Sequence, residues 1–233
     1  MTGSFSVSAL VLRRAPWRDY DRMVTLLTAE RGRLDAVVRG CRRPKSPLLS
    51  AGEPFVCGTF QIFEARERMS VTEVKVTDGF YPLREDMERL ETGAQWLKLL
   101  EGVSVPEEPA KPLFDLALEA LSFLSYTDLD RELLDTMFIL KLMRIVGVSP
   151  AADRCAVCGR PLEGQALGFD ARKGGCVCRA CAPNARAISE GARRIMLKAP
   201  RAPFKSVELL KEHPDWRQAR EKALEALSEA GIG

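Results

Sequence analysis

The chain has 233 residues, of which 46% are hydrophobic and 29% are charged, and its formal net charge is +3. This is the balance of an ordinary folded protein with one large domain or two or three small ones. The longest apolar runs are interrupted by charges, the N-terminus lacks a basic segment followed by an apolar one, and seven cysteines are an odd number in a long chain. We therefore expect no membrane span, no secretory signal and no disulfide scaffold, and we place the protein in a reducing cytoplasm.

The charged residues are unevenly distributed along the chain. Residues 1–80 carry 13 basic and 9 acidic side chains, whereas residues 81–150 carry 7 basic and 13 acidic ones. Within residues 13–45 the excess is ten basic to four acidic. A local excess of this kind indicates a polyanionic partner for the N-terminal part, and the acidic middle disfavours DNA.

Residues 5–80 alternate between apolar and other side chains with the period of β-strands. The predicted strands lie near 5–11, 23–28, 34–38, 55–65 and 70–76. Pro44 and Pro47 exclude a central strand between the third and the fourth. Five strands in this length are compatible with a small barrel, and the OB-fold is a five-stranded barrel that binds oligonucleotides. The pattern does not separate it from an SH3-like barrel, or from a structural barrel with a solvated charged face.

Two basic clusters lie around the first predicted loop and after the third predicted strand. We predict that both line a nucleic-acid groove and contact phosphates without specifying bases. The predicted DNA-binding residues are Arg13, Arg14, Arg18, Arg22, Arg39, Arg42, Arg43 and Lys45. In the same first loop, Trp17 and Tyr20 either stack on bases or pack against the protein. Asp19 and Asp21 are better explained as salt-bridged loop residues than as a catalytic metal pair.

From residue 84 the apolar period becomes that of helices. Residues 127–130 resemble a capping box before the third helix, and Ser189 is the predicted cap of a later one. The predicted helices cover about 87–100, 113–124, 133–144, 189–197 and 216–230. We therefore predict a barrel domain over 1–80, a helical domain over 81–150 and 183–233, and an insert over 151–182.

The insert contains two pairs of cysteines, Cys155-x-x-Cys158 and Cys178-x-x-Cys181, separated by nineteen residues. This is the spacing of a four-thiolate zinc site. Four thiolates fill a tetrahedron and leave no position for a catalytic water, so we predict one structural Zn²⁺ that supplies most of the folding free energy of the insert. Cys176 is a possible substitute ligand, but the repeated spacing favours Cys178. Disulfides or scattered buried thiols are the alternative to a metal.

Motifs for catalysis are missing. The sequence has no G-x-x-x-x-G-K-[ST] phosphate loop, and its only histidine, His213, stands between Glu212 and Pro214. With a single histidine, most Ser-His-Asp catalytic triads are excluded. We expect His213 to be a surface residue. A thioredoxin-like role for either cysteine pair requires a βαβ context that the pattern lacks. We therefore predict that the protein is not an enzyme.

Two stretches together resemble the bacterial recombination mediator family RecO. The resemblance of residues 11–46 rests on Val11-Leu12-x-Arg14, Thr25-Leu26-Leu27-Thr28, Glu30-Arg31-Gly32 and Gly40-x-Arg42-Arg43-x-Lys45-Ser46. Residues 155–183 are similar to the zinc segment of zinc-bearing members, with both cysteine pairs, Gly168-Phe169 and Gly174-Gly175. Two positions depart from the family pattern: Cys176 stands where an apolar residue is expected, and Asp19 where glutamate is more usual.

The resemblance implies an α+β protein with an OB-fold, a helical domain and a zinc finger. It implies a DNA repair and recombination mediator that binds single- and double-stranded DNA and anneals complementary strands. It further implies that the protein works with RecR and SSB in the RecFOR pathway to load RecA onto SSB-coated DNA in the nucleoid. The acidic C-terminal tail of SSB would need an apolar pocket with a basic rim, for which the candidates are Arg193, Arg194, Lys198 and Arg201. The rival hypothesis, a zinc-ribbon protein–protein adaptor such as a transcription-complex subunit, leaves the N-terminal arginines without a role.

Overall fold

The computed structural model of the protein describes residues 3–66, 68–162, 167–211 and 213–232. By the contacts within the chain, it divides into two compact units, Met1–Tyr126 and Thr127–Gly233. This grouping differs from the predicted three-part division, because it assigns the first two helices to the same unit as the barrel. None of the helices in the described ranges is both long and apolar enough to cross a membrane.

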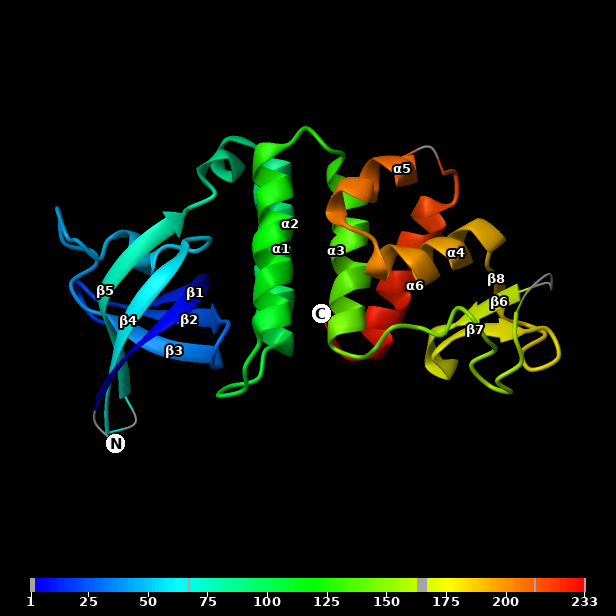
Figure 1. The fold of residues 1–233 in the computed structure, drawn as a ribbon, viewed down its shortest axis with the longest axis horizontal. Helices are drawn as coiled ribbons and strands as arrows, with labels where there is room; N and C mark the ends of the chain where they lie inside the picture. The colour runs from blue at the N-terminus through cyan, green and yellow to red at the C-terminus, as the bar shows by residue number, and fades with distance from the viewer. Residues whose placement is uncertain (1–2, 67, 163–166, 212, 233) are drawn as a thin grey trace. The chain divides into compact units, whose positions relative to one another are not determined.

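Five strands of the first unit form a closed barrel (Figure 1). They are β1 (Gly3–Pro16), β2 (Arg22–Thr28), β3 (Gly32–Val38), β4 (Cys57–Ala65) and β5 (Arg68–Asp78). The order around the barrel is β1-β2-β3-β5-β4, with β4 returning to β1. Among the described strand pairs of the barrel, only the short β3–β5 pairing is parallel. All five predicted strands are present, and the predicted OB-fold is confirmed.

Alternate side chains of these strands fill the barrel, as the period of two requires. Val7, Ala9 and Val11 of β1 belong to the buried core, together with residues of every other strand. The strand continues beyond the predicted stretch, because a register shift between Val11 and Arg13 lets it pair with β2 as far as Pro16. The shift ends the clean alternation, so the pattern alone underestimates the length of β1.

Two helices complete the first unit and lie against the barrel (Figure 1). They are α1 (Met87–Val103) and α2 (Lys111–Tyr126), preceded by the short helical turns η1 (Ser50–Gly52) and η2 (Tyr81–Glu85). The loop between α1 and α2 docks on the β2–β3 turn at Gly32, which has φ +60°. A Cβ atom there would lie 2.2 Å from the carbonyl oxygen of Val105, so this position requires glycine for both reasons.

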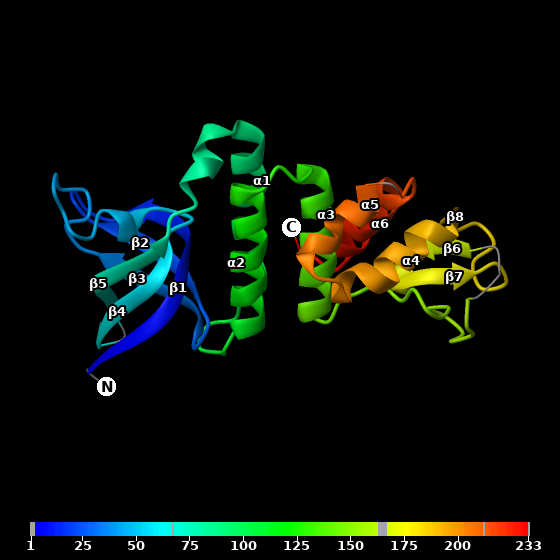
Figure 2. The ribbon, with the colours of Figure 1, turned by 45° about the horizontal axis from the view of Figure 1, so that its top comes forward.

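The second unit is helical, with a small sheet (Figure 2). Its helices are α3 (Arg131–Ile145), α4 (Glu190–Lys198), α5 (Val207–Lys211) and α6 (Trp216–Glu229), with the turns η3 (Ala171–Lys173), η4 (Ala199–Arg201) and η5 (Phe204–Ser206). The sheet consists of β6 (Leu167–Asp170), β7 (Gly175–Cys178) and β8 (Arg186–Ala187), in the order β7-β6-β8.

The helix caps show which start signals were predicted correctly. The Ser189 hydroxyl accepts the N–H of Ala192 and caps α4, as predicted. At α3 the cap is Asp130, whose carboxylate accepts the N–H groups of Glu132 and Leu133. Residues 127–130 therefore do mark a helix start, although the capping side chain is the last of the four. The five-residue α5 was not predicted, because it is too short to show a helical period.

Candidate metal centre and nucleic-acid groove

Each cysteine pair lies on a tight turn stabilised by backbone hydrogen bonds. In the first turn the N–H of Gly159 donates to the carbonyl of Cys155 (2.9 Å), and Gly159 itself has φ +71°. In the second turn the N–H of Cys181 donates to the carbonyl of Cys178 (3.0 Å). The two turns bring the sulfur atoms of all four cysteines within 4.8 Å of one another. This cluster can hold one metal ion.

The spacing of the sulfur atoms fits a tetrahedral ion. A Zn–S bond of about 2.3 Å gives S···S separations of about 3.8 Å in a tetrahedron, and the Sγ atoms of Cys158 and Cys178 lie 3.9 Å apart. Burial opposes ionisation of Cys155, but the N–H groups of Cys178, Cys158 and Val157 point at its sulfur and lower its pKa to about 6. The neighbouring thiols Cys178 and Cys158 raise the pKa of Cys181 to about 12. The neighbouring thiols thus oppose simultaneous ionisation. A bound dication would favour the thiolate form of all four, because metal ligation stabilises the deprotonated sulfur.

Cys176 lies outside this cluster. Its side chain is buried on β7, where it is the register partner of Phe169 on β6, and burial raises the pKa of its thiol to about 11. None of the seven cysteines forms a disulfide. Of the two candidates for the third ligand, the structure therefore groups Cys178 with the other three cysteines.

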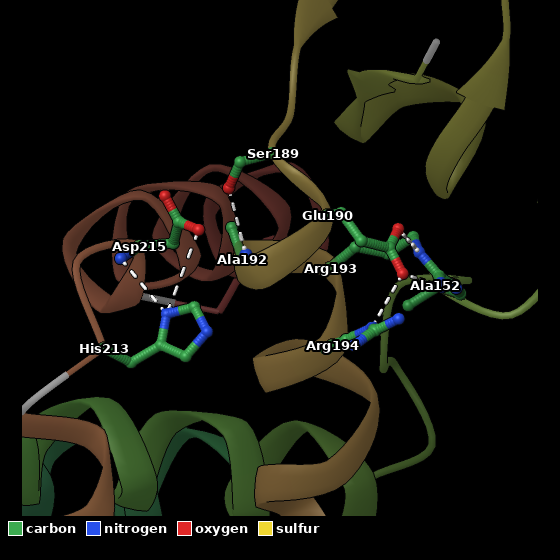
Figure 3. A network of polar contacts seen from close by, with 8 residues as sticks. All are labelled: Ala152, Ser189, Glu190, Ala192, Arg193, Arg194, His213 and Asp215. Atoms are coloured by element: carbon green, nitrogen blue, oxygen red, sulfur yellow. Dashed lines mark hydrogen bonds and ion pairs between the residues drawn. The ribbon is translucent and has the colours of Figure 1, made fainter. Parts of the chain in front are cut away.

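The base of the insert is joined to α4 by Arg193 (Figure 3). Its guanidinium donates to the carbonyl of Ala152 (2.6 Å) and to both carboxylate oxygens of Glu190 (2.7 and 2.8 Å). Arg194 donates to the same carboxylate (2.8 Å). Arg193 is only 6% exposed, so the prediction that it forms part of an exposed basic rim is wrong. A helical period does not reveal that this arginine faces the insert. Arg194, Lys198 and Arg201 are exposed.

His213 lies beside the first turn of α4 (Figure 3). Its Nδ1 is 3.9 Å from a carboxylate oxygen of Asp215, and its ring lies 2.3 Å from where a Cβ atom of Gly191 would stand. The histidine is partly exposed and packs against glycine. This position fits the predicted surface role and a contribution to packing.

A groove of about 590 Å³ crosses the outer face of the barrel. Strands β2 and β3, the β1–β2 loop (17–21) and the β4–β5 hairpin all contribute to it, and in OB-folds these elements bind oligonucleotides. Trp17, which is 51% exposed, and Phe63 add aromatic surface. The other lining residues are Arg18, Asp21, Met23, Asp35, Val37, Arg39, Ala65, Arg68, Met69 and Ser70.

Three of the eight predicted DNA-binding residues are engaged with carboxylates. Arg14 and Arg22 both pair with Glu53. The Nε of Arg13 donates to Glu101 on α1 (2.8 Å). These pairs hold the barrel to its flanking segments, and they reduce the positive charge that remains for a polyanion.

The remaining five lie on two loops that are joined to each other. The N–H of Gly40 donates to the carboxylate of Asp21 (2.7 Å), and the N–H of Arg42 donates to the carbonyl of Tyr20 (3.0 Å). The Arg43 guanidinium stacks over the Tyr20 ring, 5.1 Å from its centroid. We call the linked segments 17–21 and 39–45 the loop clasp. Among the described residues, no carboxylate pairs with its cations, which are Arg18, Arg39, Arg42, Arg43 and Lys45.

Sequence reasoning missed Arg68, an exposed cation at the start of β5 that also lines the groove. It stands outside the two dense clusters, and only the barrel closure brings it near them. The sequence did contain a signal for Arg68. It lies where the fourth and fifth predicted strands are joined, and in OB-folds the loop between these two strands takes part in oligonucleotide binding. Asp21 proved to be a loop residue, although its partner is a backbone N–H instead of a neighbouring arginine.

Comparison with known proteins places the whole chain in one family. The model described as "Recombination protein O N terminal" matches residues 1–80, and "Recombination protein O C terminal" matches residues 84–230. The chain is 32% identical over 171 residues to "DNA repair protein RecO" of Alkaliphilus metalliredigens, covering 73% of this chain and 69% of that one. The corresponding protein of Anaeromyxobacter dehalogenans is 35% identical over 182 residues (76% and 70%), and that of Pelotomaculum thermopropionicum is 30% identical over 216 residues (91% and 83%).

Proposed function

The chain belongs to the RecO family, and on that premise we propose that it is a recombination mediator that binds single- and double-stranded DNA and anneals complementary strands. The observation that carries the proposal is the groove of the OB barrel, where exposed aromatic side chains stand among arginines that pair with no carboxylate of the described residues. We further propose that the protein acts with RecR and SSB to load RecA onto SSB-coated DNA in the cell's cytoplasm.

Annealing requires no bond chemistry. Two polyanionic strands must be brought together, and bound cations reduce their repulsion by displacing condensed counterions. The cations of the loop clasp and Arg68 supply such charges beside a groove that can accept unstacked bases. We found no catalytic constellation among the described residues, and we propose that the protein is not an enzyme.

We propose that the four-cysteine cluster holds one structural Zn²⁺, as in the zinc-bearing type of the family. The ligands would be Cys155, Cys158, Cys178 and Cys181, whose sulfur atoms all lie within 4.8 Å of one another. A closed four-thiolate site supplies folding free energy and offers no open coordination position. The role of the ion would be to hold the two cysteine turns, at Cys155–Gly159 and Cys178–Cys181, together.

The test is annealing of complementary oligonucleotides by the purified protein, with naked strands and with SSB-coated strands, in the presence and absence of RecR. We expect faster annealing than in buffer alone, and a clear loss in Arg39→Glu. The matched control is Lys211→Glu, which makes the same charge change at an exposed lysine of α5. If neither substrate anneals faster with protein than without it, the adaptor hypothesis replaces the mediator.

A further inference from the structure

A carboxylate on the floor of the cationic groove is not explained by phosphate binding. Asp35 projects outward from β3 into the groove that Arg18, Arg39 and Arg68 also line. It forms no ion pair with any of them or with another cation of the described chain. In a site that only bound phosphates, this charge would repel the ligand. Asp21, the other acid of the groove, is accounted for by its bond to Gly40.

A chain of hydrogen bonds holds the Asp35 side chain in place. On α1, Glu101 accepts from Nε of Arg13 (2.8 Å), and a terminal nitrogen of Arg13 donates to the Thr25 hydroxyl (3.3 Å). That hydroxyl donates in turn to Oδ1 of Asp35 (2.6 Å). Within the described structure, Oδ2 of Asp35 accepts no hydrogen bond. One oxygen is thus fixed and the other is open to a ligand.

The composition of the groove indicates how a strand would lie in it. Its exposed guanidinium groups attract phosphates, whereas Met23, Val37 and Phe63 offer apolar surface to bases. A single strand can turn its Watson–Crick edges towards the protein, whereas a duplex keeps them paired. A base edge on this floor would meet the open oxygen of Asp35, which can only accept hydrogen bonds.

We propose that Asp35 is a specificity-determining residue that gives this groove a preference for guanine in single strands. The inference rests on the proposed binding of single-stranded DNA to the groove. Guanine is favoured because its Watson–Crick edge places two donors, N1–H and the 2-amino group, side by side against an acceptor-only carboxylate. Thymine flanks its single N–H donor with two carbonyl oxygens. Adenine and cytosine set a ring-nitrogen acceptor beside the amino group, so their edges repel the carboxylate in part.

The expected preference is modest. A good bidentate contact to a base discriminates by about five- to a hundredfold. Asp35 is exposed and Thr25 already uses one of its oxygens, so we expect the lower end, about fivefold. The arginines then supply general affinity, and Asp35 supplies the base preference.

The test compares thymine oligonucleotides that carry isolated guanines with the same strands carrying hypoxanthine, which lacks only the 2-amino group. Fluorescence anisotropy should show about fivefold tighter binding of the guanine strand. In Asp35→Asn the ratio should fall to near one, since an amide can donate as well as accept. The matched control Asp128→Asn removes the same charge at an exposed aspartate between α2 and α3, far from the loop clasp in the sequence, and should keep the ratio.

The outcomes separate this inference from the proposed function. Equal binding of the two strands by the unaltered protein, with affinity still dependent on Arg39, would overturn the role of Asp35 and leave the DNA-binding proposal standing. A fivefold ratio that persists in Asp35→Asn would also overturn it. Absence of binding to either strand would remove both the proposed function and the inference that rests on it.

Discussion

Replacement of the three groove arginines, Arg18, Arg39 and Arg68, by alanine should make DNA binding less sensitive to salt. All three are exposed, and among the described residues none forms an ion pair, so the substitutions remove positive charge without breaking a structural contact. Because phosphate contacts do not specify bases, binding to all sequences should weaken to a similar degree. The barrel itself should remain folded.

The size of the effect follows from the number of available cations. The loop clasp provides five, and Arg68 adds one. If each of the six neutralises one phosphate of a single strand, the slope of log K against log salt is about −4, since each contact contributes about 0.7. The triple substitution should therefore reduce the slope by about 2. Arg14 and Arg22 should contribute little, because Glu53 already pairs with both.

The assay is a salt titration of oligonucleotide anisotropy, with circular dichroism to verify the fold. The charge-matched control replaces Lys198, Lys205 and Lys211, three exposed lysines of the second unit, by alanine. It should leave the slope near its original value. A folded groove variant whose slope equals that of the unaltered protein would refute the assignment of this groove to DNA.

Four further substitutions test three other parts of the structure. Cys178→Ser should lose zinc in metal analysis and make the insert sensitive to protease, whereas Cys176→Ser should retain zinc and lose about 1–3 kcal/mol of stability from a buried hydroxyl; the reverse pattern would show that the ligand assignment is wrong. Arg193 lowers the pKa of Glu190 to about 2, so this pair should stabilise the fold above pH 4.5 and lose its effect as the pH falls towards 2. Because Glu190 is 43% exposed, we expect Glu190→Gln to cost only about 1 kcal/mol at neutral pH in urea denaturation, and a larger cost at pH 3 than at pH 7 would contradict this account. Gly32→Ala should lower stability by at least about 2 kcal/mol, because φ is positive and the Val105 carbonyl leaves no room for Cβ; an unchanged melting temperature would count against it.

Local patterns were sufficient to predict most of the fold and which four cysteines lie together. The barrel strands show a period of two, and the long helices show a helical period. Two Cys-x-x-Cys turns already determine which sulfur atoms can approach one another, so spacing distinguished Cys178 from Cys176. Where the backbone departs from regular geometry, as at the register shift after Val11, the pattern underestimated the element.

Contacts between distant segments were not predictable from these patterns. Glu53 is 31 residues from Arg22 along the chain, and only barrel closure brings it to two of the predicted DNA-binding arginines. In the sequence, Arg193 is indistinguishable from an exposed helix arginine, and only the folded structure shows that it donates to the carbonyl of Ala152. In both cases an acceptor from a distant part of the chain determines whether the arginine side chain is available to a ligand. The local sequence does not show which distant acceptor will lie beside it.

The loop clasp has a consequence for the speed of binding. Its two segments are held together by main-chain bonds from Gly40 and Arg42, so the arginines project from a backbone that is already ordered. A strand that arrives at such a surface does not have to wait for a loop to fold, and it loses less entropy on binding. Long-range attraction to these cations raises the association rate further. We therefore expect this surface to capture DNA rapidly, and differences between strands to appear mainly in how long each remains bound.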